Sequence, residues 1–266
     1  MNTRDTQRFP VGTFTPAPKL AKSSKIVAAQ AKIEALLFLR HGEQQLLSMI
    51  IPVAMLVGLS LFRVNDLADP VQRMFPMTLA IAVMGAGFTG QAIAVAFDRR
   101  YGALKRIGAS GVPTWALIAG KVAAVAVVVL LQVLVLSVVA ILLGWEPSWH
   151  AVPAGLLLLV LGVTTFTSLG LLLGGTLSSE MVLALANTVW FVLLGSAVYV
   201  AMMGDNLAVV PRYALMMIPS VALSEGFHSA VAGMGINMWS VAVLVVWTFF
   251  GVVAARKLFR FTMESD

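Results

Sequence analysis

DRRYGALKRI, at residues 98–107, separates two long apolar runs, MTLAIAVMGAGFTGQAIAVAF at 77–97 and ALIAGKVAAVAVVVLLQVLVLSVVAILL at 116–143. An apolar helix needs about 20 residues to cross about 30 Å of hydrocarbon, and both runs reach that length. The stretch between them contains one acid and four cations, Arg99, Arg100, Lys105 and Arg106. It therefore predicts a short charged segment at one side of a membrane, between two spans.

The composition of the whole chain indicates a membrane protein. Of the 266 residues, 59% are hydrophobic and 11% are charged, against about 25% charged residues in a soluble domain. The mean hydropathy is +0.93. The absence of cysteine excludes a disulfide framework, a thiolate metal site and a cysteine nucleophile. Membrane topology accounts for the net charge of +6, so we expect no nucleic-acid partner.

Six apolar stretches predict six transmembrane helices in an all-α integral membrane protein. They cover roughly Leu46–Phe62, Met77–Phe97, Ala116–Leu143, Val152–Leu177, Met181–Met203 and Trp239–Ala255. The first is the shortest and contains Pro52, a residue that kinks helices. Together they predict one transmembrane domain over residues 46–255.

The distribution of basic residues predicts the orientation, because Lys and Arg gather on the cytoplasmic side of membrane proteins. With a cytoplasmic amino terminus, fifteen of the 18 Lys and Arg residues lie inside. The three outside are Arg63, Arg73 and Arg212. We therefore expect a multi-pass protein of the cell membrane, with both termini and residues 98–107 in the cytoplasm.

The segments that flank the transmembrane domain differ in character. Residues 1–22 are rich in proline and have little to bury, which predicts a disordered cytoplasmic tail, and 256–266 predict a second cytoplasmic tail. Over 23–45, apolar residues recur at spacings of three and four, and lysines lie elsewhere around the helix. A basic amphipathic helix before a span is typical of the membrane interface. A helical extension of the first span is the alternative.

Two glycine patterns occur within the apolar runs. Gly85-Ala-Gly-Phe-Thr-Gly90 has the spacing of a dinucleotide-binding fingerprint, but no acid follows about twenty residues later to bind a ribose. Gly170 and Gly174 form a second pair at helical spacing. We interpret both patterns as small residues that allow close helix packing.

The longest connection between spans, residues 204–238, is interrupted by proline and charged residues yet remains apolar. This pattern predicts short re-entrant or interfacial helices before the last span, because backbone at membrane depth must form its hydrogen bonds internally. Glu225 and His228 are three residues apart and would share a helix face. A solvated polar edge is the favoured interpretation of that pair, and a metal or proton site is the alternative.

The sequence offers no catalytic constellation. There are three histidines and no H-E-x-x-H or G-x-S-x-G motif. We interpret Glu180 as a solvated acid in the turn between two spans. The centres of the predicted spans lack the ionisable residues of an ion-coupled transporter. The sequence also lacks the G-x-x-x-x-G-K-[ST] motif of an ATP-binding loop. We therefore expect no enzyme activity and no cofactor on this chain, and an energy source on a separate chain.

The predicted architecture resembles the membrane (permease) subunit of ABC-2 type ABC exporters. The residues that carry the resemblance are Asp98-Arg-Arg-Tyr-Gly-Ala-Leu-Lys-Arg106, Gly111-Val-Pro113 and Gly120-Lys121. They are similar to the family's order of charged residues, Gly, a small residue, Leu, Arg, a Pro-containing turn and a later Gly-Lys. The family often has Thr-Pro after the Arg, where this chain has Gly108-Ala-Ser-Gly-Val-Pro113.

In that family the charged segment is the coupling helix, which docks on a separate ATP-binding subunit. The resemblance implies this contact for Asp98, Arg99, Arg100, Tyr101, Gly102, Leu104, Lys105 and Arg106, with an apolar ridge of Tyr101, Leu104 and Ile107. It also implies a dimer with a second copy or a related permease in the lipid bilayer. ATP and magnesium would be bound by the partner subunits.

The resemblance implies that the chain is the permease of an ATP-driven exporter for a hydrophobic or amphipathic substrate, such as a drug or lipid. The path would lie at the dimer interface, along the first, second and fifth spans. The polar or adaptable candidates to line it are Gln91, Asn187, Thr188, Tyr199 and Met202. The alternative is a membrane channel or assembly factor without ATP coupling. A membrane-embedded lipid enzyme would need a cluster of His, Asp or Glu at one interface, and none is visible.

Overall fold

The computed structural model describes residues 22–261 apart from 41, 62–68 and 204–205. The described residues form helices joined by short turns, without a strand among them. The helices are Ser23–Arg40 (α1), Gly42–Leu61 (α2), Pro70–Met84 (α3), Gly85–Gly90 (η1, a π-helix), Gln91–Arg100 (α4), Ala103–Ala109 (α5), Thr114–Leu142 (α6), Ala151–Thr176 (α7), Ser179–Met203 (α8), Val209–Leu215 (α9), Pro219–Val231 (α10) and Met238–Leu258 (α11). The predicted tail at 1–22 lies outside the described residues except for Lys22, and so do residues 262–266 of the second tail.

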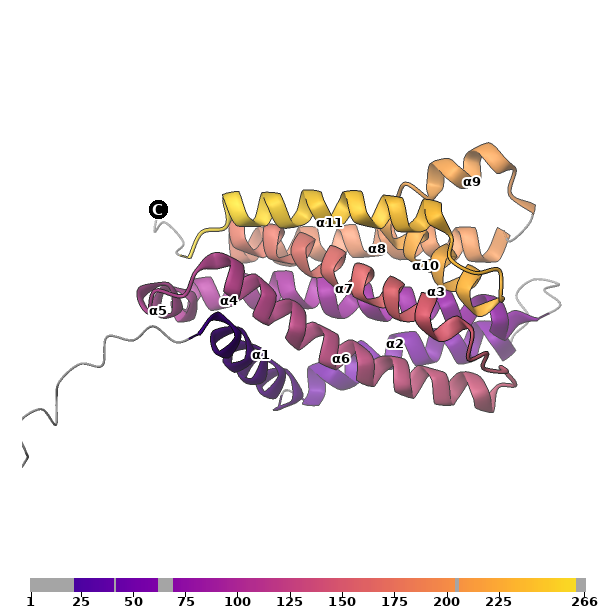
Figure 1. The fold of residues 1–266 in the computed structure, drawn as a ribbon, viewed down its shortest axis with the longest axis horizontal. Helices are drawn as coiled ribbons and strands as arrows, with labels where there is room; N and C mark the ends of the chain where they lie inside the picture. The colour runs from indigo at the N-terminus through magenta and orange to yellow at the C-terminus, as the bar shows by residue number, and fades with distance from the viewer. Residues whose placement is uncertain (1–21, 41, 62–68, 204–205, 262–266) are drawn as a thin grey trace, which may run out of the picture.

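Five of these helical segments are long and apolar enough to cross a membrane. They are the continuous helix Pro70–Arg100, which comprises α3, η1 and α4, and the helices α6, α7, α8 and α11. They run side by side along the long axis of the bundle (Figure 1). α5 and the end of α11 lie at one end of the bundle, and α9 and α10 lie at the other. The prediction of an all-helical fold is confirmed for the described residues, and five of the six predicted spans fall on helices that are long and apolar enough to cross a membrane.

α2 is the sixth predicted span. Its apolar part, Ser48–Leu61, is shorter than the other five segments. The whole helix has 20 residues, and at about 1.5 Å of rise per residue it measures about 30 Å. α2 packs beside α3 and α6. Its crossing of the membrane stays a prediction.

The helix of the second span begins at Pro70 and not at the predicted Met77. Asp69 caps it, since its carboxylate accepts a hydrogen bond from the backbone nitrogen of Gln72 at 3.2 Å, and proline suits the first helical position. The sequence pattern misplaced the start because Arg73 interrupts the apolar run. In the structure Arg73 is buried beside Glu225.

The glycine pairs lie where α7 meets η1 and α4. A Cβ on Gly87 would lie 3.1 Å from Cβ of Phe166, and one on Gly170 would lie 2.6 Å from the carbonyl oxygen of Phe88. A Cβ on Gly174 would clash with the backbone of Ala92. These glycines therefore let backbones approach closely, which confirms the packing interpretation. The dinucleotide reading fails because helix α3, and not a strand, precedes the motif.

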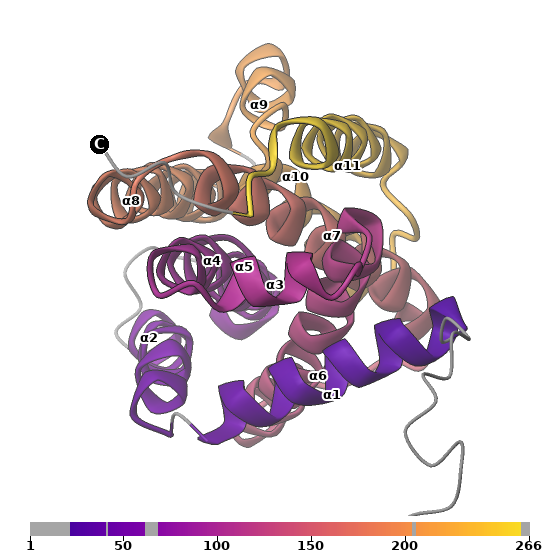
Figure 2. The ribbon, with the colours of Figure 1, turned by 90° about the vertical axis from the view of Figure 1, so that its left-hand side faces the viewer.

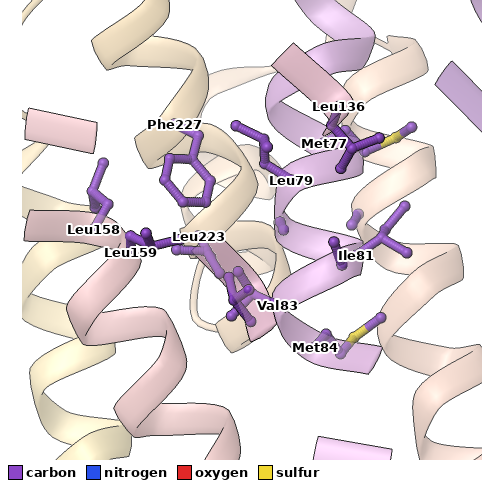
Figure 3. Close-up of a cluster of buried hydrophobic side chains, with 14 of the residues drawn as sticks. Met77, Leu79, Ile81, Val83, Met84, Leu136, Leu158, Leu159, Leu223 and Phe227 are labelled. Atoms are coloured by element: carbon purple, nitrogen blue, oxygen red, sulfur yellow. The ribbon is translucent and has the colours of Figure 1, made fainter. Parts of the chain in front are cut away.

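The main hydrophobic core joins α3 to α6, α7 and α10 (Figure 3). α10 contributes Leu223 and Phe227, which lie between side chains of α7 and α3. Gly162 of α7 leaves space for Leu223, because a Cβ on Gly162 would lie 2.7 Å from Cδ2 of Leu223. The other labelled members are Met77, Leu79, Ile81, Val83, Met84, Leu136, Leu158 and Leu159. The core therefore includes a short helix that is not one of the long spans.

α1 lies across one end of the bundle, where the long helices are seen nearly end-on (Figure 2). It packs on α6, and Gly120 of α6 allows the approach, since a Cβ there would lie 2.6 Å from Cγ of Gln30. Its other faces expose apolar side chains such as Ile33 and the cations Lys25 and Lys32. α1 is thus no straight extension of α2. Its location at a membrane interface stays a prediction.

The connection before the last span contains the short helices α9 and α10. No residue of α9 is buried, and both ribbon views show α9 standing out from the bundle. In α10, every residue from Pro219 to Phe227 is buried, which agrees with the prediction of short helices tucked against the bundle. The predicted solvated edge at Glu225 and His228 is wrong for Glu225, whose side chain is only 4% exposed. Two arginines from other helices, Arg73 and Arg212, make this burial possible.

Candidate functional site

The charged stretch at 98–107 folds as a tight turn followed by the short helix α5. α4 ends at Arg100, and Gly102 reverses the chain with a backbone φ of 74°, which favours glycine. After α5, Gly111 adopts a φ of 77° and Pro113 precedes α6. α5 therefore forms a hairpin-like link between two long helices at one end of the bundle (Figure 1).

Leu104 anchors α5 in a second hydrophobic cluster. Its side chain is fully buried, and Ile107 packs beside it. The cluster also draws on α4, α6, α7 and α11 through Val95, Leu117, Ile118, Leu171 and Ala255, and on the following Phe259 and Phe261. The predicted apolar ridge is thus divided: Leu104 and Ile107 hold α5 on the bundle, whereas Tyr101 is 73% exposed.

Arg99 is buried and ties α4 to the end of α7. Its Nη1 donates to the carbonyl oxygens of Gly174 at 2.8 Å and Leu177 at 2.9 Å. The last carbonyls of a helix lack intrahelical partners, and a cation there also interacts favourably with the helix dipole. Arg99 therefore serves as a structural cap of α7 in this conformation.

Asp98 faces the buried amino group of Lys121. The Nζ atom of Lys121 lies 3.5 Å from Oδ2 of Asp98 and 2.6 Å from Oε1 of Glu34. Lys121 is completely buried, so its charge depends on these two carboxylates. The three side chains come from α4, α6 and α1, so they connect the turn before α5 to the helix that lies across this end of the bundle.

The remaining charged side chains of the turn face outward. Lys105 and Arg106 are exposed, and Arg100 pairs with Glu180 at the start of α8 at 2.5 Å. We refer to Arg100, Tyr101, Lys105 and Arg106 as the candidate docking surface. It comprises three cations and one aromatic ring within residues 100–106. A surface of this kind suits an acidic protein partner, since Arg forms fork-like contacts with carboxylates.

The structure brings only part of the predicted substrate path to one groove. A groove of about 230 Å³ lies between α2, the α3–η1–α4 helix and α8, and all its lining residues are uncharged. Asn187 lines it, but Gln91, Thr188, Tyr199 and Met202 do not. Gln91 is buried, Thr188 and Tyr199 are exposed along α8, and Met202 is partly buried.

Sequence reasoning missed two groups that belong to this groove. Trp190 lines it from α8 and Thr89 from η1. The indole Nε1 of Trp190 and the hydroxyl of Thr89 are buried without a hydrogen-bond partner among the described residues. The sequence signal at this place was the glycine-rich stretch Gly85–Gly90. Only the structure shows that it forms a π-helical turn, and such turns are frequent at functional sites.

The comparisons with known proteins agree with this architecture. The family model described as "ABC-2 family transporter protein" matches residues 65–256, which span the structure from just before α3 to the last turn of α11. No curated protein and no solved structure matches the chain significantly. With most of its length covered by that model, the chain belongs to the ABC-2 family of transporter membrane proteins.

Proposed function

We propose that this chain is the permease subunit of an ATP-driven exporter, and that a separate ATP-binding subunit docks on Arg100, Tyr101, Lys105 and Arg106. The observation that carries the proposal is that α5 exposes its charged side chains and buries its leucine. Its cations face outward, while Leu104 is fully buried in a cluster with four long helices. A contact on the outer face is thereby joined to a rigid inner anchor.

This geometry suits force transmission. Packed interiors shift as units and do not deform continuously. A partner that moves α5 therefore moves α4 and α6 directly, since both adjoin α5 in the chain. α7 and α11 follow because they share the buried cluster around Leu104. Arg99 and Asp98 act in this proposal as positioning residues, and the outward residues make the contact.

The groove between α2, η1 and α8 is the proposed part of the substrate path on this chain. It is largely apolar and uncharged, which suits a hydrophobic or amphipathic cargo. Trp190 and Thr89, whose buried polar groups have no hydrogen-bond partner among the described residues, are part of its lining. α8 exposes apolar side chains such as Phe191 and Val192, so a second copy or a related permease can complete the path there.

The proposed topology places the docking surface in the cytoplasm. α1, the α4–α5 turn and the end of α11 lie at the same end of the bundle, and this end contains the clustered cations Lys25, Lys32, Lys105, Arg106 and Lys257. Basic residues favour the cytoplasmic side. With α2 as a sixth span, both termini are cytoplasmic, α1 lies in the inner interface and α9 and α10 lie at the outer face.

The proposal is tested by capturing the tagged chain from native membranes in mild detergent. We expect a stoichiometric ATP-binding cassette ATPase to copurify and to be lost from the variant Lys105→Glu/Arg106→Glu. The matched control is Arg256→Glu/Lys257→Glu, which makes the same charge change on exposed residues at the same end of the bundle. Capture of no nucleotide-binding partner, or equal loss from both variants, would contradict the proposed docking surface.

A further inference from the structure

A cluster of charged side chains lies at the end of the bundle opposite α5. It consists of Arg73 on α3, Arg212 on α9, and Glu225 and His228 on α10. We propose that this α10 charge cluster is a latch: Arg73 fixes α10 within the bundle, and Arg212 holds α9 closed over it by a contact that can release. The latch follows from the structure of this chain alone, and only its role in transport rests on the proposed function.

Glu225 divides its two carboxylate oxygens between the two arginines. Its Oε1 lies 3.1 Å from Nη2 of Arg73, and its Oε2 accepts from Nη2 and Nε of Arg212 at 2.5 and 3.1 Å. A carboxylate that is only 4% exposed needs such partners, because burying an unpaired charge is costly. Glu225 therefore links α9 and α3 through a single side chain.

The Arg73 side of the cluster is built to stay in place. Arg73 also donates to the carbonyl oxygens of Ala201 at 3.2 Å and Val200 at 3.4 Å, in the last turns of α8. Its Nη1 lies 3.0 Å from Nδ1 of His228, which accepts in the tautomer protonated at Nε2. Arg73 is itself buried, so any one of these contacts is supported by the others. It can keep Glu225 paired when another partner leaves.

The Arg212 side is the one that can open. Arg212 is 26% exposed, so water can hydrate it once it leaves Glu225, whereas Arg73 has little access to water. None of the residues of α9 is buried, and its contribution to the hydrophobic clusters is the partly buried Leu215, which packs against Val200, Met216 and Val221. In addition to the ion pair of Arg212, α9 makes an edge-to-face contact between the rings of Tyr213 and Trp239, whose centroids lie 5.7 Å apart. Segments with few buried apolar contacts open at low free-energy cost.

The segment that follows α9 borders an open apolar groove. The chain between α9 and α10, at Met217 and Ile218, forms part of the wall of this groove, which measures about 540 Å³ and lies between α7, α8 and α11. The indole Nε1 of Trp247 on α11 donates to the carbonyl oxygen of Met217 at 2.9 Å, which ties this wall to α11. A movement of α9 is thus passed directly to this wall, so opening of the latch changes the shape of the groove.

The chain contains no cysteine, so one engineered thiol reports on the latch without background. Met216 follows α9 directly and is buried. In Met216→Cys, we measure the rate of modification by a charged maleimide on protein purified in nanodiscs, where both faces are accessible. Adding Arg212→Gln is expected to raise that rate at least about tenfold, because it removes a charge-assisted hydrogen bond from the closed state.

Two controls separate latch opening from general unfolding. Val210→Ala changes an exposed residue of α9 and is expected to leave the rate unchanged. Ala222→Cys places a thiol at a fully buried site of α10, where Arg212→Gln should leave it unreactive, because Arg73 still holds α10. An unchanged rate at Met216→Cys, or an equal rise at both thiols, would overturn the latch. The experiment needs no ATP-binding partner, so its result is independent of the capture test above.

Discussion

The amino group of Lys121 on α6 lies 2.6 Å from the carboxylate of Glu34 on α1. The lysine is completely buried, whereas Glu34 is partly exposed, and Asp98 provides a second carboxylate at 3.5 Å. This contact joins α1 to the long helix that follows α5. It is therefore both a support for α1 and a physical link between α1 and the proposed docking surface.

Removing the charge partner of Lys121 should loosen α1. We expect Glu34→Gln to lower the free energy of unfolding by about 1–3 kcal/mol, because a buried ammonium loses its nearer counter-ion. Thermal unfolding in detergent, together with hydrogen exchange over α1, measures both effects. Lys32→Gln changes an exposed residue of the same helix and serves as the control. An unchanged melting temperature in Glu34→Gln would show that Asp98 alone balances Lys121.

Replacing Arg99 should weaken the junction of α4 and α7. Arg99→Lys keeps the charge but cannot hold both carbonyl oxygens with the geometry of a guanidinium. We expect a loss of about 1–2 kcal/mol of stability and faster hydrogen exchange at the end of α7. Arg106→Lys is the matched control, since Arg106 is exposed on the adjoining helix. Equal melting temperatures of the two variants would contradict the capping role.

The apolar runs carried most of the information about the fold, since a run of about twenty apolar residues has few stable alternatives to a membrane span. Which charged residues are buried could not be predicted from the sequence. Glu225 looked solvated because its partners, Arg73 and Arg212, come from other helices. Lys121 and Glu34 are likewise joined only by tertiary packing.

The orientation of α5 was predictable only in part. The sequence indicated a charged segment with Tyr101, Leu104 and Ile107 at three-residue spacing. In a continuous helix this spacing would place the three side chains on the same side. Spacing does not tell which face meets the bundle. The structure turns Leu104 inward and leaves Tyr101 outside, because the left-handed Gly102 separates α4 from α5. The groove depends on α2, η1 and α8 together, so local sequence patterns could not reveal it.

The ion pair of Arg100 with Glu180 offers a way to separate direct docking from support within the chain. Both side chains are largely exposed, so breaking the pair should leave stability unchanged. If Arg100 contacts the ATP-binding subunit directly, Arg100→Gln weakens capture of that subunit and Glu180→Gln does not. We expect this result. An equal loss of capture in the two variants would instead assign Arg100 a positioning role through Glu180.

Close packing of α7 on η1 and α4 should make Gly170 intolerant of a single methyl group. A Cβ on Gly170 would lie 2.6 Å from the carbonyl oxygen of Phe88, a backbone atom that cannot rotate away. We expect Gly170→Ala to cost about 1–3 kcal/mol of stability through overpacking. Gly155→Ala is the matched control on the same helix, because a Cβ there meets nothing within 4 Å; it should be neutral or stabilise by up to about 1 kcal/mol. Equal unfolding midpoints for the two variants would show that α7 can shift away from η1 without loss, and the close approach would then not be needed for the fold.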